Sequence, residues 1–138
     1  CHCLVGSEMC IRDSLKPKAR VLGYGHAGVR PEVMGVGPIP AVQNLLKNTG
    51  LSISDFDVIE SNEAFAAQAI AVNRGLDLDP KVVNPNGGAI ALGHPVGATG
   101  AIITLKALYQ LEIINGKRAL ITMCIGGGQG IALAIERI

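Results

Sequence analysis

The chain has 138 residues, a formal net charge of +1 and a composition that is 49% hydrophobic. This length suits one domain with a sizeable core, which must be aliphatic because the chain has no Trp, two Phe and two Tyr. The near-neutral charge argues against a nucleic-acid binder or a polybasic membrane adaptor, so we expect neither nucleic acid nor membrane as a partner.

Residues 1–14 (CHCLVGSEMCIRDS) show neither helical nor strand periodicity and look foreign to the rest of the chain. We expect a non-native or disordered leader at 1–14 and one domain at 15–138. Three of the four cysteines, Cys1, Cys3 and Cys10, crowd this leader, while Cys124 stands alone. That distribution is no disulfide framework and matches no zinc pattern, so we expect a reducing, cytoplasmic setting without a metal or a resident cofactor.

From Leu15 onward, short apolar runs alternate with helical spacing, and Gly or Pro separates them. The pattern predicts strands at residues 19–24, 58–60, 82–83, 119–124 and 130–135, and helices at 39–49, 64–72 and 96–111. This βαβαβαββ order predicts an α/β domain with a mixed, mostly parallel five-stranded sheet and helices on both faces. The last helix is apolar nearly all round, so we expect it to be buried on most sides.

Ligands on such sheets bind where strands end and helices begin, which predicts chemistry in the loops 61–63, 87–97 and 124–128. His94 stands before the last helix, where the helix dipole disfavours a positive imidazole. A neutral imidazole can act as a general base or as a donor to an oxyanion. A buried histidine bonded to backbone is the plainer interpretation.

Cys124 ends a strand and precedes a glycine turn whose backbone N–H groups could form an oxyanion hole. A thiol there could take part in acyl chemistry, although free cysteines usually act as small buried hydrophobes. Asn62 could hold a water, or it could cap a helix with Glu63 in the first turn. Residues 23–28 fit a dinucleotide-binding pattern, but no helix follows, so we reject that site and leave His26 unassigned.

Three segments, 62–65 (NEAF), 87–95 (GGAIALGHP) and 124–130 (CIGGGQG), together resemble the three C-terminal motifs of thiolases. Residues 35–38 (GVGP) also resemble a loop of that family, and the resemblance covers about residues 15–138. It implies that His94 activates a nucleophilic cysteine from an N-terminal half, and that Cys124 moves a proton at the α-carbon of acetyl-CoA. Asn62 would hold a water that, together with His94, stabilises the enolate oxygen. Gly126 would supply an oxyanion-hole N–H, and Met34 and Phe65 would line the acyl pocket.

The resemblance therefore implies an acyltransferase of fatty acid metabolism: the C-terminal half of a thiolase. The full enzyme would catalyse Claisen condensation of acetyl-CoA with an acyl-enzyme, or thiolytic cleavage of 3-ketoacyl-CoA, with the coenzyme A thioester as substrate. We expect the chain to lack the nucleophilic half, to be inactive alone, and to belong to a homodimer or homotetramer at full length. The alternatives are a Cys–His acyl hydrolase that uses Cys124 and His94, and an inert fragment or carrier relative.

Overall fold

The computed structural model describes residue 14 and residues 16–138. The expected leader, residues 1–14, therefore lies outside the described residues except for Ser14. The described strands are β1 (Ala19–Gly28), β2 (Val58–Ser61), β3 (Arg118–Ile125) and β4 (Gln129–Arg137). The described helices are α2 (Pro38–Thr49), α3 (Ala66–Gly75), α4 (Ala89–Leu92) and α5 (Thr99–Ile114), with 3-10 turns η1 (Pro31–Val36) and η2 (Ile53–Asp55).

The four strands form one mixed sheet in the order β1-β4-β3-β2. Strand β4 is antiparallel to both of its neighbours, and β2 is parallel to β3. Three strands therefore run in one direction and only β4 opposes them. The α/β class and the antiparallel closing pair agree with the sequence analysis.

The predicted fifth strand at residues 82–83 is wrong, because in the described chain it is reduced to a single parallel bridge between Ile59 and Val83. The next residue, Asn84, has a φ of 46° and turns the chain away from the sheet. Its side-chain amide then forms two hydrogen bonds with the backbone of Ser61. The Asn84 Oδ1 accepts from the Ser61 N at 2.9 Å, and the Asn84 Nδ2 donates to the Ser61 O at 2.8 Å. A side chain thus replaces the strand that the sequence pattern predicted.

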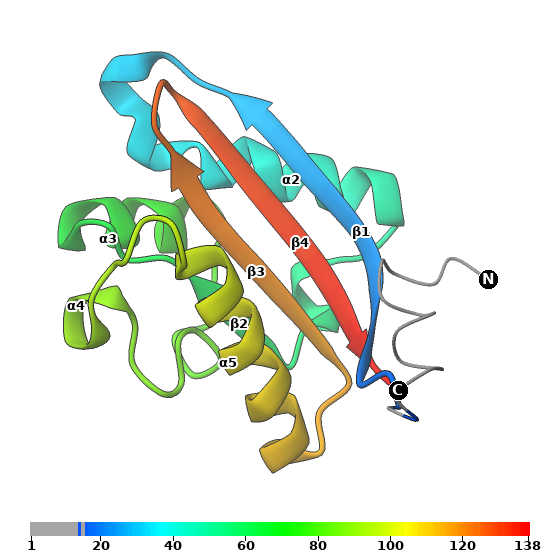
Figure 1. Ribbon diagram of the computed structural model, residues 1–138. Helices are drawn as coiled ribbons and strands as arrows, with labels where there is room; N and C mark the ends of the chain where they lie inside the picture. The colour runs from blue at the N-terminus through cyan, green and yellow to red at the C-terminus, as the bar shows by residue number, and fades with distance from the viewer. Residues whose placement is uncertain (1–13, 15) are drawn as a thin grey trace.

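Helices cover both faces of the sheet, as predicted (Figure 1). Because side chains alternate along a strand, Leu120 packs with the α2 residue Leu45, while its neighbour Ile121 packs with the α5 residue Ile103. Strand β1 crosses α2 so closely that a Cβ on Gly25 would overlap the backbone oxygen of Ala41. Two aliphatic layers, one on each side of the sheet, therefore form the core.

Helix α5 is buried on one face only, which corrects the expectation that it is covered on most sides. Ile103, Ala107 and Leu111 face the sheet, but Leu105 is 51% exposed and Ile113 is 76% exposed. The sheet covers one side of the helix, and the described chain places no further layer over the other. No helix in the described part of the chain is long and apolar enough to cross a membrane.

Candidate functional site

Two of the three predicted loops begin at the same edge of the sheet. Asn62 directly follows β2, and its backbone N donates to the Thr122 O of β3 at 3.0 Å. Cys124 lies two residues further along β3. The carboxyl ends of the parallel strands β2 and β3 therefore place Asn62 and the Cys124 turn next to each other.

The third loop reaches this edge through His94. The Asn62 Nδ2 lies 3.4 Å from the His94 Nε2, although the two residues are 32 positions apart in the sequence. Asn62 is 2% exposed, whereas His94 is half-buried and keeps a route to solvent. The helix-cap interpretation of Asn62 is wrong, because α3 begins at Ala66 and its cap residue is Phe65.

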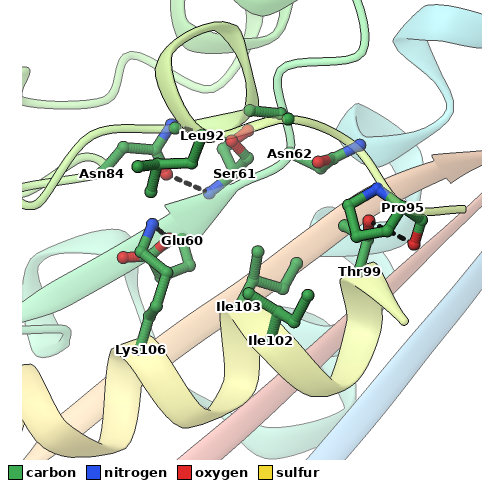
Figure 2. A pocket seen from close by; sticks show the side chains of 13 residues that line it. Glu60, Ser61, Asn62, Asn84, Leu92, Pro95, Thr99, Ile102, Ile103 and Lys106 are labelled. Carbon is green, nitrogen blue, oxygen red and sulfur yellow. Dashed lines mark hydrogen bonds and ion pairs between the residues drawn. The ribbon is translucent and has the colours of Figure 1, made fainter.

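The other nitrogen of the His94 ring has a hydrogen-bond partner of its own. Its Nδ1 lies 2.7 Å from the Oγ1 of Thr99, the first residue of α5. The same hydroxyl donates to the Pro95 O at 3.0 Å, as the dashed line in Figure 2 marks. Thr99 is 2% exposed, so this contact is shielded from water. The sequence analysis missed Thr99, although a hydroxyl five residues after His94 at a helix start was an available signal.

A small pocket lies beside these groups, between β2, the loop after α4 and the first turns of α5 (Figure 2). Glu60 is fully buried, and its Oε2 forms an ion pair with the Lys106 Nζ at 2.9 Å. Lys106 also donates to the backbone Gly87 O, at 2.5 Å. Burial raises the pKa of the Glu60 carboxyl, and the Lys106 ammonium opposes that shift without cancelling it. Lys106 is the only charged residue in the apolar stretch 96–111, and this isolated charge could have indicated a buried partner from the sequence.

Glu63 holds the loop that carries His94 and does not belong to the first turn of a helix. Its Oε2 accepts from the Ile90 N at 3.1 Å, and its Oε1 accepts from the Asn84 Nδ2 at 3.3 Å. The carboxylate lies so close to Gly88 that a Cβ there would overlap it. Gly88 is therefore required for the close approach of this loop to Glu63.

Cys124 is 7% exposed and is the penultimate residue of β3. Burial raises the pKa of its thiol, which favours the protonated form. Within the described chain, the hydrogen bonds of the His94 ring go to Asn62 and Thr99, not to this thiol. The structure thus puts Cys124 at the same sheet edge as His94 without joining the two by a hydrogen bond.

The turn after Cys124 exposes backbone, as the sequence analysis anticipated. Gly127 and Gly128 have φ values of 84° and 86°, which only glycine adopts readily, and Gly126 is exposed with open space around it. The Gln129 side chain crosses the turn: its Nε2 donates to the Gly126 O at 3.4 Å and its Oε1 meets the His26 Nε2 at 3.0 Å. His26, left unassigned from sequence, therefore supports this turn.

The two residues expected to line an acyl pocket lie on neighbouring elements. Met34 is half-buried in η1, and Phe65 is 63% exposed immediately before α3. These elements touch, since a Cβ on Gly35 would lie 2.7 Å from the Gln68 Cγ. Their assignment to an acyl pocket stays a prediction.

A family model described as "Thiolase, C-terminal domain" matches residues 15–137. Beta-ketothiolase BktB of Cupriavidus necator is 63% identical over 127 residues, which are 92% of this chain and 32% of that protein. Beta-ketoadipyl-CoA thiolase of Pseudomonas knackmussii is 58% identical over 137 residues, which are 98% of this chain and 34% of that protein.

Solved structures give the same result. The crystal structure of human mitochondrial 3-ketoacyl-CoA thiolase superposes with a TM-score of 0.90 and 48% identity, over 95% of this chain and 33% of that one. The acetyl-CoA acetyltransferase of Bacillus anthracis has a TM-score of 0.90 and 45% identity, over 96% of this chain and 34% of that one. The chain therefore spans about a third of the length of the relatives it matches.

Proposed function

Because this chain belongs to the thiolase family, we propose that it is the C-terminal catalytic segment of an acyltransferase acting on coenzyme A thioesters. The whole enzyme would join acetyl-CoA to an acyl group held on a cysteine, or cleave 3-ketoacyl-CoA by the reverse reaction. The names of the relatives, which include beta-ketothiolase and acetyl-CoA acetyltransferase, support this substrate class. The observation that carries the proposal is the contact between Asn62 and the His94 Nε2, which unites two motifs at the carboxyl edge of the sheet.

The proposed chemistry depends on the needs of a thioester α-carbon. Its protons are weakly acidic, so their removal needs a positioned base and donors aimed at the developing oxyanion. In the condensation, the Cys124 thiolate would take the proton, and the enolate carbon would attack the acyl carbonyl. The carbon–carbon bond would form as the acyl–sulfur bond breaks, which returns the nucleophilic cysteine as a thiolate.

The surroundings of each group support its role. Burial raises the pKa of the Cys124 thiol, so its thiolate is a stronger base than an ordinary one and its thiol can return a proton in the cleavage direction. The open backbone at Gly126 suits an oxyanion donor. His94 would activate the nucleophilic cysteine, and Asn62 would hold a water beside it. Met34 and Phe65 would contact the acyl chain.

The geometry gives less support to a Cys–His hydrolase. Such an enzyme needs its thiol within hydrogen-bond reach of the base and a lowered thiol pKa. Here Asn62 and Thr99 are the partners of the two His94 nitrogens, and burial shifts the pKa of the Cys124 thiol upward. An unhydrolysed acyl adduct on Cys124 after exposure to an acyl donor would nevertheless favour the hydrolase.

The proposal extends to the assembly and its setting. The remaining two-thirds of the enzyme would supply the nucleophilic cysteine and most of the coenzyme A contacts. Cys124 is a free, buried cysteine, which suits the reducing cytoplasm. A homodimer or homotetramer would be the working form of the whole enzyme.

The test joins this chain to the part of the Cupriavidus necator relative that precedes the matched region. The fusion should cleave acetoacetyl-CoA in the presence of coenzyme A, whereas the 138-residue chain alone should not. The variants His94→Gln and Cys124→Ser should each lower kcat by about 10²- to 10⁴-fold. The exposed-site variant Lys47→Ala serves as the matched control and should keep full activity. Turnover by the chain alone, or a folded but inactive fusion, would refute the proposal.

A further inference from the structure

We propose that Thr99 is a positioning residue that fixes the tautomer of His94, placing the ring proton on Nδ1 and leaving Nε2 unprotonated so that it can act as the base. Thr99 lies at the start of α5, and its Oγ1 is 2.7 Å from the His94 Nδ1. The inference rests on the proposed function only where it assigns His94 as a base.

The number of available protons determines the direction of this hydrogen bond. A threonine hydroxyl carries one proton. The Thr99 hydroxyl also contacts the Pro95 O at 3.0 Å, and a carbonyl oxygen can only accept. Both contacts are hydrogen bonds only if the hydroxyl donates to Pro95 and the imidazole donates to the hydroxyl. The Nδ1 of neutral His94 therefore carries the proton.

The opposite side of the ring agrees with this assignment. The Asn62 group nearest the His94 Nε2 is the Nδ2 amide, a donor, at 3.4 Å. A donor faces a lone pair, so Nε2 is unprotonated in the same arrangement. Asn62 is 2% exposed, and its backbone N is bonded to the Thr122 O, which limits movement of the residue. The Asn62 contact is thus compatible with the tautomer that the two Thr99 contacts specify.

Helix structure alone does not require the Thr99 hydroxyl. The backbone N–H of Thr99 already donates to the Pro95 O at 2.9 Å, and that of Ala98 does so at 2.8 Å. These two bonds close the turn before α5 without a side chain. The hydroxyl is therefore available to orient the imidazole, as the partner of one ring nitrogen commonly does for the other.

The tautomer can be measured directly in the 138-residue chain. We would label its three histidines with ¹⁵N, assign them with His2→Gln and His26→Gln variants, and record the ring nitrogen shifts of His94 at about pH 9, where an ordinary imidazole is neutral. The expected spectrum shows a protonated Nδ1 and an unprotonated Nε2. Thr99→Val, which keeps the shape and removes the acceptor, should move the population toward the Nε2–H form, and Thr99→Ser should restore the original spectrum. A His94 ring protonated on Nε2 in the unsubstituted chain, or a spectrum that Thr99→Val leaves unchanged, would overturn the inference.

Kinetics of the fusion enzyme test the consequence separately. Thr99→Val should lower kcat by about 10²-fold with little change in KM, because general-base catalysis contributes about 10²- to 10⁴-fold. Thr99→Ser should retain most of the rate. Equal kcat in Thr99→Val and the unsubstituted fusion would overturn the positioning role. If the unsubstituted fusion is inactive, the proposed function fails, and the ring nitrogen shifts still decide the tautomer.

Discussion

The side-chain amide of Asn84 forms hydrogen bonds with both the backbone N–H and the backbone C=O of Ser61. In a sheet, the backbone of a residue on a neighbouring strand would make these two bonds. The Asn84 Oδ1 accepts from the Ser61 N at 2.9 Å, and the Asn84 Nδ2 donates to the Ser61 O at 2.8 Å. Ser61 is 3% exposed, so these backbone groups would otherwise lack partners in a dry setting. One asparagine therefore completes the edge of the sheet immediately before Asn62, a residue of the candidate site.

This relationship predicts that Asn84→Ala destabilises the chain by about 2–4 kcal/mol, because it orphans a buried donor and acceptor. Asn84 also has a φ of 46°, which alanine tolerates poorly. Asn84→Gly is the matched control: it keeps the backbone conformation and removes only the side chain, so it should cost less than alanine. Urea unfolding measures both changes, and amide exchange at Ser61 should accelerate in both variants. Unchanged exchange at Ser61 would contradict the role of this side chain.

The Glu60–Lys106 ion pair supports a second prediction. Lys106→Met should lower the free energy of unfolding by about 3–5 kcal/mol, because it leaves the fully buried Glu60 carboxylate without its cation. The double variant Glu60→Leu/Lys106→Met should recover most of that loss, since apolar packing can replace a buried pair. Chemical denaturation of the three proteins gives the comparison. If the double variant is as unstable as Lys106→Met, then Lys106 stabilises the fold mainly through its hydrogen bond to the Gly87 O and not through its ion pair with Glu60.

Glu60 should also make stability depend on pH. Burial raises the pKa of its carboxyl above the ordinary 4.5, so the folded chain binds a proton more tightly than the unfolded chain. This contribution is fully present below the ordinary pKa and is lost as the pH rises through the folded pKa. Relative to Glu60→Gln, the original chain should therefore lose stability as the pH rises from about 4. Urea midpoints that differ by a constant amount across this range would argue against a raised pKa.

Cys124 should react slowly with alkylating reagents. The thiolate is the reacting form, and burial raises the pKa of this thiol above the ordinary 9.0. In a chain carrying Cys1→Ser, Cys3→Ser and Cys10→Ser, iodoacetamide should modify Cys124 more slowly than a free thiol, with a rate that still increases above pH 9. Mass spectrometry follows the adduct, and Cys124→Ser is the blank. A rate that levels off near neutral pH would indicate an activated nucleophile and would favour the hydrolase.

The sequence predicted the α/β order and the loops of the candidate site because glycine and proline separate the apolar runs so clearly. It could not predict the loss of the fifth strand. Val82 and Val83 have the side chains typical of a strand, and the pairing is limited to one bridge because the chain turns at Asn84. The sequence analysis also missed Thr99 and the partner of Lys106. Both depend on contacts across a fold: Lys106 and Glu60 are 46 positions apart, and a threonine at a helix start has an ordinary structural explanation.

The outer face of α5 predicts self-association of the isolated chain. Leu105, Tyr109 and Ile113 are 51%, 52% and 76% exposed along one side of a helix, and a contiguous apolar surface of this kind favours association in water. Leu105→Gln/Ile113→Gln should shift the chain toward monomer in sedimentation velocity. Its free energy of unfolding should change by less than about 1 kcal/mol, because neither side chain is buried.

Tyr24 provides the control for this last prediction, since it is 68% exposed on the edge strand β1, whereas α5 packs mainly on β2 and β3. Tyr24→Gln removes a comparable apolar side chain and should leave the association unchanged. If both variants weaken association equally, the contact is a general effect of apolar surface. If the unsubstituted chain sediments as a monomer at every concentration, the exposed face of α5 does not drive association. Only a selective effect of the Leu105 and Ile113 changes would identify this helix as a surface that needs a covering layer in the whole enzyme.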